Sequence, residues 1–330
     1  MPGLVPALLS FVPVTALLLC LNALDTYRLL TLRRVVSAVL AGVAAALVCY
    51  PLNTLNFARW GGDYAFFGAP AVEEAVKAAY IFYCIARHRV AFPVDAAVTG
   101  FAVGAGFGLL ENLVYLYQLP PLHSPMVWLV RGLGTALMHG GATAIVAMGA
   151  VTLAARWRWW GAALPSLALA IALHTLYNLG SMPPLDRTAQ ILLTLPALLA
   201  AVFWKSERML AGWLHGKLDS DIEVLSMMES GAFPASPRGR YLEALRDSFP
   251  PEVVADLFCL IRMSVELSAQ AKGALLRREL GFPDEPDPGR AAMLKEMAYL
   301  EENIGMVGRA AIAPLFTVSA RDRWERQQVK

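Results

Sequence analysis

Ionisable side chains stand inside several long apolar segments of this chain. A carboxylate or an imidazole within a bilayer is energetically costly and usually has a function. Their recurrence in four successive segments predicts one shared polar site, near which Lys77 also lies. The candidate residues of this site, in chain order, are Glu73 and Glu74, then Glu111 with Asn112, then His139, and finally His174 with Asn178.

Glutamate and histidine are the residue types that activate water. Two histidines and one glutamate with an open position form a familiar catalytic zinc set, so we expect Glu111, His139 and His174 to bind Zn²⁺ or another divalent metal. A remaining carboxylate would be the general base. The same groups could also act without a metal, with a glutamate and a histidine activating water while His174 and Asn178 stabilise the oxyanion. The sequence leaves both mechanisms open, but it contains no HExxH pattern, which excludes a zincin-type site.

The two adjacent glutamates are expected to divide their roles. Glu73 and Lys77 are spaced i, i+4 and are predicted to pair on one helix face. Glu74 points about 100° away, which favours it over Glu73 as the base, but the sequence leaves the choice between the two open. A simple helix start would also favour carboxylates, because they interact well with the helix dipole, but it would leave the deeper Lys77 unexplained. Lys77 and Asn112 are therefore predicted to support the site.

The composition predicts an all-α polytopic membrane bundle. The chain has 330 residues, of which 57% are hydrophobic and 16% charged, whereas soluble proteins have about 25% charged residues. Charges become dense after Trp204, so residues 1–204 are predicted to form a multi-span membrane domain and residues 205–330 a cytoplasmic helical domain. A span needs about 20 apolar residues. Seven segments qualify: 4–24, 35–57, 67–86, 94–118, 127–154, 161–180 and 187–204.

Basic residues occupy alternate connections between these spans, which predicts the orientation. By the positive-inside rule the N-terminus lies outside and the C-terminus in the cytoplasm. Glu73, Glu111 and His174 then lie in the outer half of the bilayer, and His139 lies roughly 18 Å into its span, near the middle. The residues that set this orientation are Arg28, Arg33, Arg34, Arg87, Arg89, Arg156, Arg158, Lys205 and Arg208.

Small residues in the fourth span are expected to bring Glu111 to its partners. Gly100, Gly104 and Gly108 recur every four residues and form a stripe that continues into Glu111. Such stripes allow close helix packing in membranes. We therefore expect Glu111 to face a neighbouring helix and not lipid.

Four short motifs, in this order, carry a resemblance to a known family. EEAVK (73–77), GFGLLEN (106–112), His139 and HTLYN (174–178) resemble the PrsW family of intramembrane proteases, over about residues 30–205. That family is similar to the type II CAAX-processing and bacteriocin-processing membrane proteases, whose second motif reads FxxxH where this chain has Phe107 and Glu111. The resemblance implies a metalloprotease of the bacterial inner membrane. Its substrates would be membrane-anchored proteins such as anti-sigma factors, cleaved near the extracytoplasmic face.

Two other classes of function remain as alternatives. A proton-coupled transporter also carries buried carboxylates and histidines, but the two halves of the chain show no internal repeat and the polar residues gather on one side. A non-catalytic scaffold could use the polar residues as contacts between helices, although such contacts contribute only about 0.6–2 kcal/mol each. The net charge of +2 gives no indication of nucleic-acid binding. The C-terminal domain shows no catalytic pattern and is expected to pack, self-associate or bind a cytoplasmic partner.

Overall fold

The computed structural model describes residues 4–25, 27, 29–118, 124–153, 159–282, 288–315, 321 and 324. Every regular element in this part of the chain is a helix, which confirms the all-α prediction. The chain divides into two compact units, Met1–Arg208 and Met209–Lys330. The predicted domain boundary lies four residues before this division.

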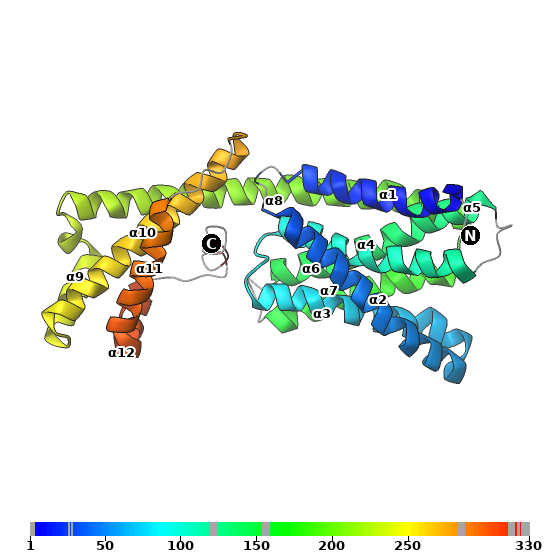
Figure 1. The fold of residues 1–330 in the computed structure, drawn as a ribbon, viewed down its shortest axis with the longest axis horizontal. Coiled ribbons are helices and arrows are strands. Elements are labelled where there is room, and N and C mark those ends of the chain that lie inside the picture. Colours follow the sequence, from blue (N-terminus) through cyan, green and yellow to red (C-terminus); the bar gives the residue numbers. More distant parts are fainter. Residues whose placement is uncertain are drawn as a thin grey trace. The chain divides into compact units, whose positions relative to one another are not determined.

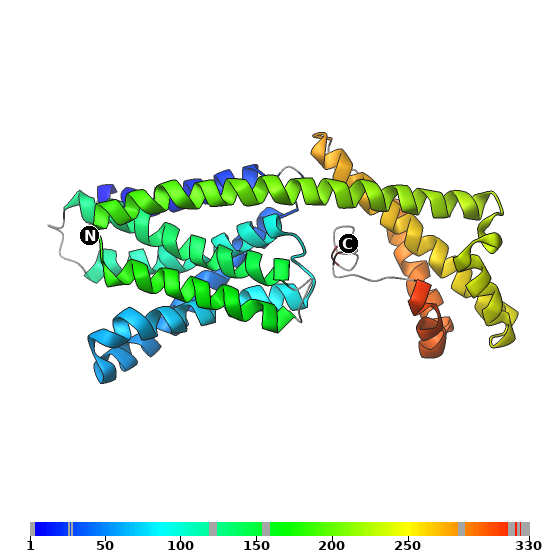
Figure 2. The ribbon, with the colours of Figure 1, turned by 180° about the vertical axis from the view of Figure 1, so that it is seen from behind.

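The first unit is a helical bundle (Figures 1 and 2). Two π-helical segments, η1 (Tyr64–Gly68) and η2 (Val130–Thr135), lead directly into helices that carry site residues. The α-helices of this unit are α1 (Leu4–Ala23), α2 (Leu32–Trp60), α3 (Ala69–Ala86), α4 (Pro93–Gln118), α5 (Pro125–Leu129), α6 (Ala136–Leu153), α7 (Trp159–Leu179) and the first part of α8 (Pro184–Glu229).

Five helices among the described residues are long and apolar enough to cross a membrane, as expected of an integral membrane protein. They are α1, α2, α4, the continuous helix Pro125–Leu153 and α8. A sixth, Ala163–Leu179 within α7, is apolar but shorter, and α3 carries Glu73, Glu74 and Lys77. The count of seven spans and the orientation remain predictions. Of the basic residues used for the orientation, Arg28, Arg156 and Arg158 lie outside the described residues.

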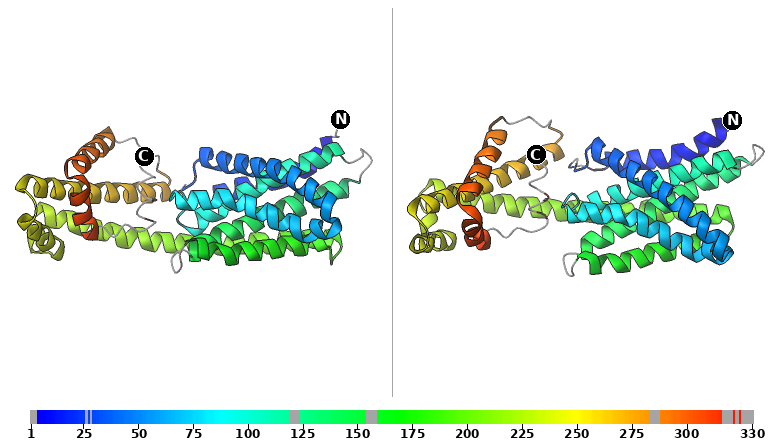
Figure 3. Two further views of the ribbon diagram at one scale, coloured as in Figure 1. Left: turned by 90° about the horizontal axis from the view of Figure 1, so that it is seen from below. Right: turned by 60° about the horizontal axis from the view of Figure 1, so that its bottom comes forward.

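Helix α4 is central to the bundle. It packs against α1, α2, α3 and α6, and 72% of its apolar window is buried, compared with 22% for α1. Figure 3 shows α1 and α2, in blue, on one side of the first unit and α7, in green, on the other. The helix that carries Glu111 is therefore enclosed by other helices.

The glycine stripe explains how closely α4 approaches α6. A Cβ atom at Gly104 would overlap the carbonyl group of His139, and one at Gly100 would lie 2.7 Å from the Cα of Ala144. At Gly108 it would lie 3.0 Å from the Cα of Ala136. All three glycines face α6, which confirms the prediction that the stripe serves close packing.

The second unit contains the rest of α8 and four further α-helices. Helix α8 runs through the predicted end of the last span at Trp204, because no proline or glycine interrupts residues 197–211 and apolar residues recur beyond them at helical spacing. A buried ion pair, Asp221 Oδ2 to Lys272 Nζ at 2.8 Å, joins α8 to α10. The further helices are α9 (Pro237–Ala244), α10 (Pro251–Glu279), α11 (Pro288–Asn303) and α12 (Gly305–Ile312).

Candidate active site

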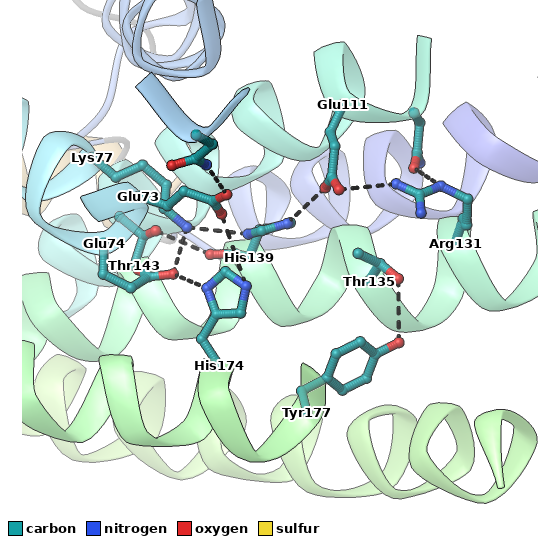
Figure 4. Close-up of polar contacts among 12 residues, drawn as sticks. Glu73, Glu74, Lys77, Glu111, Arg131, Thr135, His139, Thr143, His174 and Tyr177 are labelled. Carbon is teal, nitrogen blue, oxygen red and sulfur yellow. Dashed lines mark hydrogen bonds and ion pairs between the residues drawn. The ribbon is translucent and has the colours of Figure 1, made fainter. Parts of the chain in front are cut away.

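Four helices bring the predicted site residues together inside the first unit (Figure 4). Helix α3 contributes Glu73, Glu74 and Lys77, and α4 contributes Glu111 and Asn112, while α6 contributes His139 and α7 contributes His174. Glu73 is near the start of α3, whereas Glu111 is near the end of α4 and His174 near the end of α7. The rings of His139 and His174 meet edge to face, with their centroids 4.8 Å apart. Residues from four separate segments therefore form one cluster.

Lys77 pairs with Glu74 and not with Glu73, so the predicted pairing was wrong. Lys77 Nζ lies 2.6 Å from Glu74 Oε1, and both side chains are fully buried. Lys77 Nζ also lies 3.1 Å from His139 Nδ1 and 4.7 Å from the centre of the Phe107 ring. The i, i+3 pair is preferred because Glu74 and Lys77 both face the protein interior, while Glu73 lies at its edge. The argument that favoured Glu74 as the base rested on the wrong pairing.

Glu74 also fixes the orientation of His174. Its Oε1 lies 2.8 Å from His174 Nδ1. Because an ionised carboxylate only accepts hydrogen bonds, His174 donates through Nδ1–H. In the neutral ring this leaves Nε2 with a free lone pair. That nitrogen lies 3.8 Å from Glu73 Oε2, which is beyond hydrogen-bonding distance.

Glu111 orients the second histidine. Its Oε2 lies 2.8 Å from His139 Nε2, and its Oε1 lies 3.1 Å from Arg131 Nη2. Arg131 Nε in turn donates to Asn112 Oδ1 at 3.1 Å, and the guanidinium stacks on Tyr115 at 3.6 Å. Asn112 donates to the Ser10 carbonyl at 3.1 Å, which ties this group to α1. Asn112 therefore links Arg131, the partner of Glu111, to α1.

The π-helical segment η2 precedes His139 and carries two side chains with different partners, Arg131 and Thr135. Arg131 reaches Glu111, whereas the Thr135 hydroxyl lies 3.3 Å from Tyr177 Oη on α7. Thr135, at the end of this π-helical segment, thus has a different partner from Arg131 and His139, which both contact Glu111. Arg131 and His139 therefore share Glu111 on α4, while Thr135 contacts α7 (Figure 4).

Glu73 has different partners from the other two glutamates. Its Oε1 accepts a hydrogen bond from Asn53 Nδ2 on α2 at 2.8 Å, and Asn53 Oδ1 accepts one from the Tyr64 hydroxyl at 2.8 Å. The Glu73 side chain is 15% exposed, whereas Glu74 is fully buried. Sequence reasoning missed Asn53 and Tyr64, because a neutral polar residue in an apolar helix is common. The only available signal was the position of Asn53 inside a predicted span.

Glu73, His139 and His174 are arranged as a possible metal-binding set. One ligand atom from each lies within 4.8 Å of the others. The two histidines and one carboxylate fit a catalytic zinc site, and carboxylates on the far nitrogens of both rings are the usual support for such ligands. The predicted third ligand, Glu111, is instead one of these supporting carboxylates. Lys77 opposes a cation here, because its ammonium group is 3.1 Å from His139 Nδ1.

Asn178 is not joined to this cluster. It lies one turn beyond His174 on α7 and is half-buried. None of the side-chain hydrogen bonds found among the described residues involves it. The structure therefore brings together all the predicted site residues except Asn178.

Comparison with known protein families agrees with the motifs. A model described as PrsW family intramembrane metalloprotease matches residues 27–204, which is more than half of the chain. This range contains all of α2 to α7 and every residue of the cluster. Neither the curated proteins nor the solved structures gave a match. The chain therefore belongs to the PrsW family of intramembrane proteases.

Proposed function

We propose that this protein is an endopeptidase that hydrolyses peptide bonds of membrane-anchored proteins, such as anti-sigma factors, near the extracytoplasmic face, with water activated at Glu73. The observation that supports this most is the approach of Glu73, His139 and His174 to within 4.8 Å of one another. Such a group of a carboxylate and two imidazoles can bind water, accept its proton and support a developing negative charge.

Glu73 is the glutamate best suited to accept the proton. Glu74 is paired with Lys77, and Glu111 with Arg131, so both of these carboxylates are already balanced by a cation. The hydrogen-bond partner of Glu73 is the neutral amide of Asn53. Its partial exposure also gives water a route that the fully buried Glu74 lacks. We therefore place the general base at Glu73.

The other side chains of the cluster orient the two histidines and balance charge. Glu74 holds His174 with Nε2 directed towards Glu73, and Glu111 holds His139 beside it. Lys77 balances the charge of Glu74 inside the bundle. Asn178, one turn beyond His174, would stabilise the oxyanion only if a bound peptide brought its carbonyl to this half-buried amide.

In the alternative, metal-assisted mechanism Glu73 would be a ligand and not the base, and it would hold a divalent metal such as Zn²⁺ together with His139 and His174. When bound, such an ion would polarise the scissile carbonyl and lower the pKa of its water to about 7. Binding at His139 Nδ1 requires Lys77 to keep only its contact with Glu74. The supporting roles of Glu74 and Glu111 are the same with and without the ion.

The side of the membrane follows from the ends of the helices. Glu73 at the start of α3, Glu111 towards the end of α4 and His174 towards the end of α7 belong to helices that alternate in direction along the predicted topology. By the positive-inside rule, the basic connections favour the extracytoplasmic side for those ends. We therefore propose that substrates are cut close to that surface.

The proposal is tested with purified full-length protein in detergent and a reporter substrate that has one membrane span. Wild-type protein should cut the reporter near one end of its span, and His174→Ala should not. Cleavage by His174→Ala at the wild-type rate would reject the site. Elemental analysis and exhaustive chelation, followed by the same assay, separate the two mechanisms: full activity without bound metal would reject the metal and leave the site assignment intact.

A further inference from the structure

Two neutral side chains outside the charged motifs form a hydrogen-bonded chain that ends on Glu73. The Tyr64 hydroxyl donates to Asn53 Oδ1 at 2.8 Å, and Asn53 Nδ2 donates to Glu73 Oε1 at 2.8 Å. Asn53 comes from α2 and Tyr64 from η1, so the chain links two elements to the start of α3. It reaches one oxygen of Glu73 and leaves the other near His174.

The donors and acceptors in these two hydrogen bonds follow from the charge of Glu73. An ionised carboxylate has no donor, so Asn53 must present its NH₂ group to Glu73. In this orientation the amide oxygen accepts a hydrogen bond from the Tyr64 hydroxyl. If the amide turned over, its oxygen would face the Glu73 carboxylate and the interaction would become repulsive. Tyr64 therefore acts on Glu73 through Asn53.

The local backbone keeps Tyr64 in place. Tyr64 opens the π-helical segment η1, which runs directly into α3. A Cβ atom at Gly68 would overlap the ring carbons of Tyr64, so only glycine allows the ring to lie against this turn. Single π turns inside helices occur frequently at functional sites. The segment that carries Tyr64 is thus continuous with the helix that carries Glu73.

We propose that Asn53 and Tyr64 are positioning residues for peptide hydrolysis, which hold Glu73 Oε1 so that Oε2 faces His174 Nε2. The inference rests on the proposed role of Glu73. Reacting groups must be held close to their productive geometry, and a displacement of about 1 Å can reduce the rate by about 10²-fold. Asn53 and Tyr64 should consequently affect kcat and leave KM almost unchanged.

The test compares kcat and KM for cleavage of the single-span reporter by purified full-length variants. Asn53→Leu should lower kcat by up to about 10²-fold. Tyr64→Phe removes one neutral hydrogen bond and keeps the ring, so it should lower kcat by about fivefold. The double variant should match Asn53→Leu alone, because Tyr64 acts only through Asn53. If Asn53→Leu does not fold, Tyr64→Phe still decides the matter.

Tyr50→Phe is the matched control for Tyr64→Phe, and Tyr50 lies on α2, the helix that carries Asn53. It removes a hydrogen bond of 2.9 Å between Gln118 on α4 and Tyr50 on α2, without a link to Glu73. Its kcat should equal that of the wild type. A loss of kcat in Tyr50→Phe equal to that in Tyr64→Phe would mean that such hydrogen bonds only stabilise α2, and it would overturn the inference.

Two further results would also overturn the inference. One is an additive loss of kcat in the double variant, and the other is a wild-type kcat in Tyr64→Phe. If Glu73→Gln is inactive in these cases, the proposed role of Glu73 stands; an active Glu73→Gln would reject that role itself.

Discussion

The three glutamates of the cluster differ in what balances their charge. Glu74 faces Lys77 and Glu111 faces Arg131, whereas Glu73 faces the Asn53 amide. Motif spacing predicted which residues would meet, but not how they would pair. Lys77 is compatible with either glutamate at i, i+3 or i, i+4. The choice depends on which face of α3 is buried and on His174, which also contacts Glu74, and neither can be read from α3 alone.

The burial of the Glu74–Lys77 pair leads to a stability prediction. Lys77→Met leaves Glu74 buried without its cation and should destabilise the first unit by about 3–5 kcal/mol. Arg246→Met is the matched control, because Arg246 and Glu243 form a pair with the same spacing whose side chains are 64% and 56% exposed. Its loss should change the stability of the second unit by about 0–1 kcal/mol. Denaturation in detergent measures the stability of each unit in the two variants. A loss of stability in Lys77→Met as small as that in Arg246→Met would show that Lys77 is not needed to balance the charge of Glu74.

At the scale of elements, close packing of α4 on α6 sets the distance between Glu111 and His139. The glycine stripe could be predicted because small residues every four positions have one main use in membranes. The π turns of η1 and η2 could not, since no residue pattern distinguishes them from α-helix. They matter here because Arg131 and Tyr64 both lie in them.

Gly104→Ala tests this packing. The added Cβ would overlap the His139 carbonyl, so α4 and α6 must separate. We expect lower thermal stability and a loss of cleavage of at least about tenfold, since displacement of a positioned group reduces the rate steeply. Gly212→Ala on α8 is the control, because its Cβ meets no atom within 4 Å. It should be neutral or stabilising by up to about 1 kcal/mol. Equal effects of the two changes on cleavage would contradict the packing argument.

At the scale of the whole molecule, composition predicted the helical class and the apolar segments closely. The first six predicted spans each overlap a helix of the first unit. The seventh predicted span, 187–204, lies inside α8, which continues beyond it to Glu229. Hydropathy falls where a helix leaves the apolar region, but hydrogen bonding along its backbone continues, so a change of composition marks a change of environment and not an end of structure.

The orientation can be measured with the cysteines that the chain already has. Cys259 on α10 is exposed, and Cys49 and Cys84 are buried. With the exposed Cys20 changed to serine, a membrane-impermeant maleimide should label Cys259 only after the cells are permeabilised, because the second unit is expected in the cytoplasm. Labelling of intact cells would reverse the orientation and move the site to the cytoplasmic side.

The central claim is that Glu73, beside His139 and His174, activates the water that cleaves the substrate. The most direct measurement is single-turnover cleavage of a single-span reporter by Glu73→Gln, with wild-type protein in parallel and thermal unfolding as the check on folding. The loss of a general base predicts a rate lower by about 10²–10⁴-fold in a protein that remains folded. Cleavage by folded Glu73→Gln at the wild-type rate would contradict the claim.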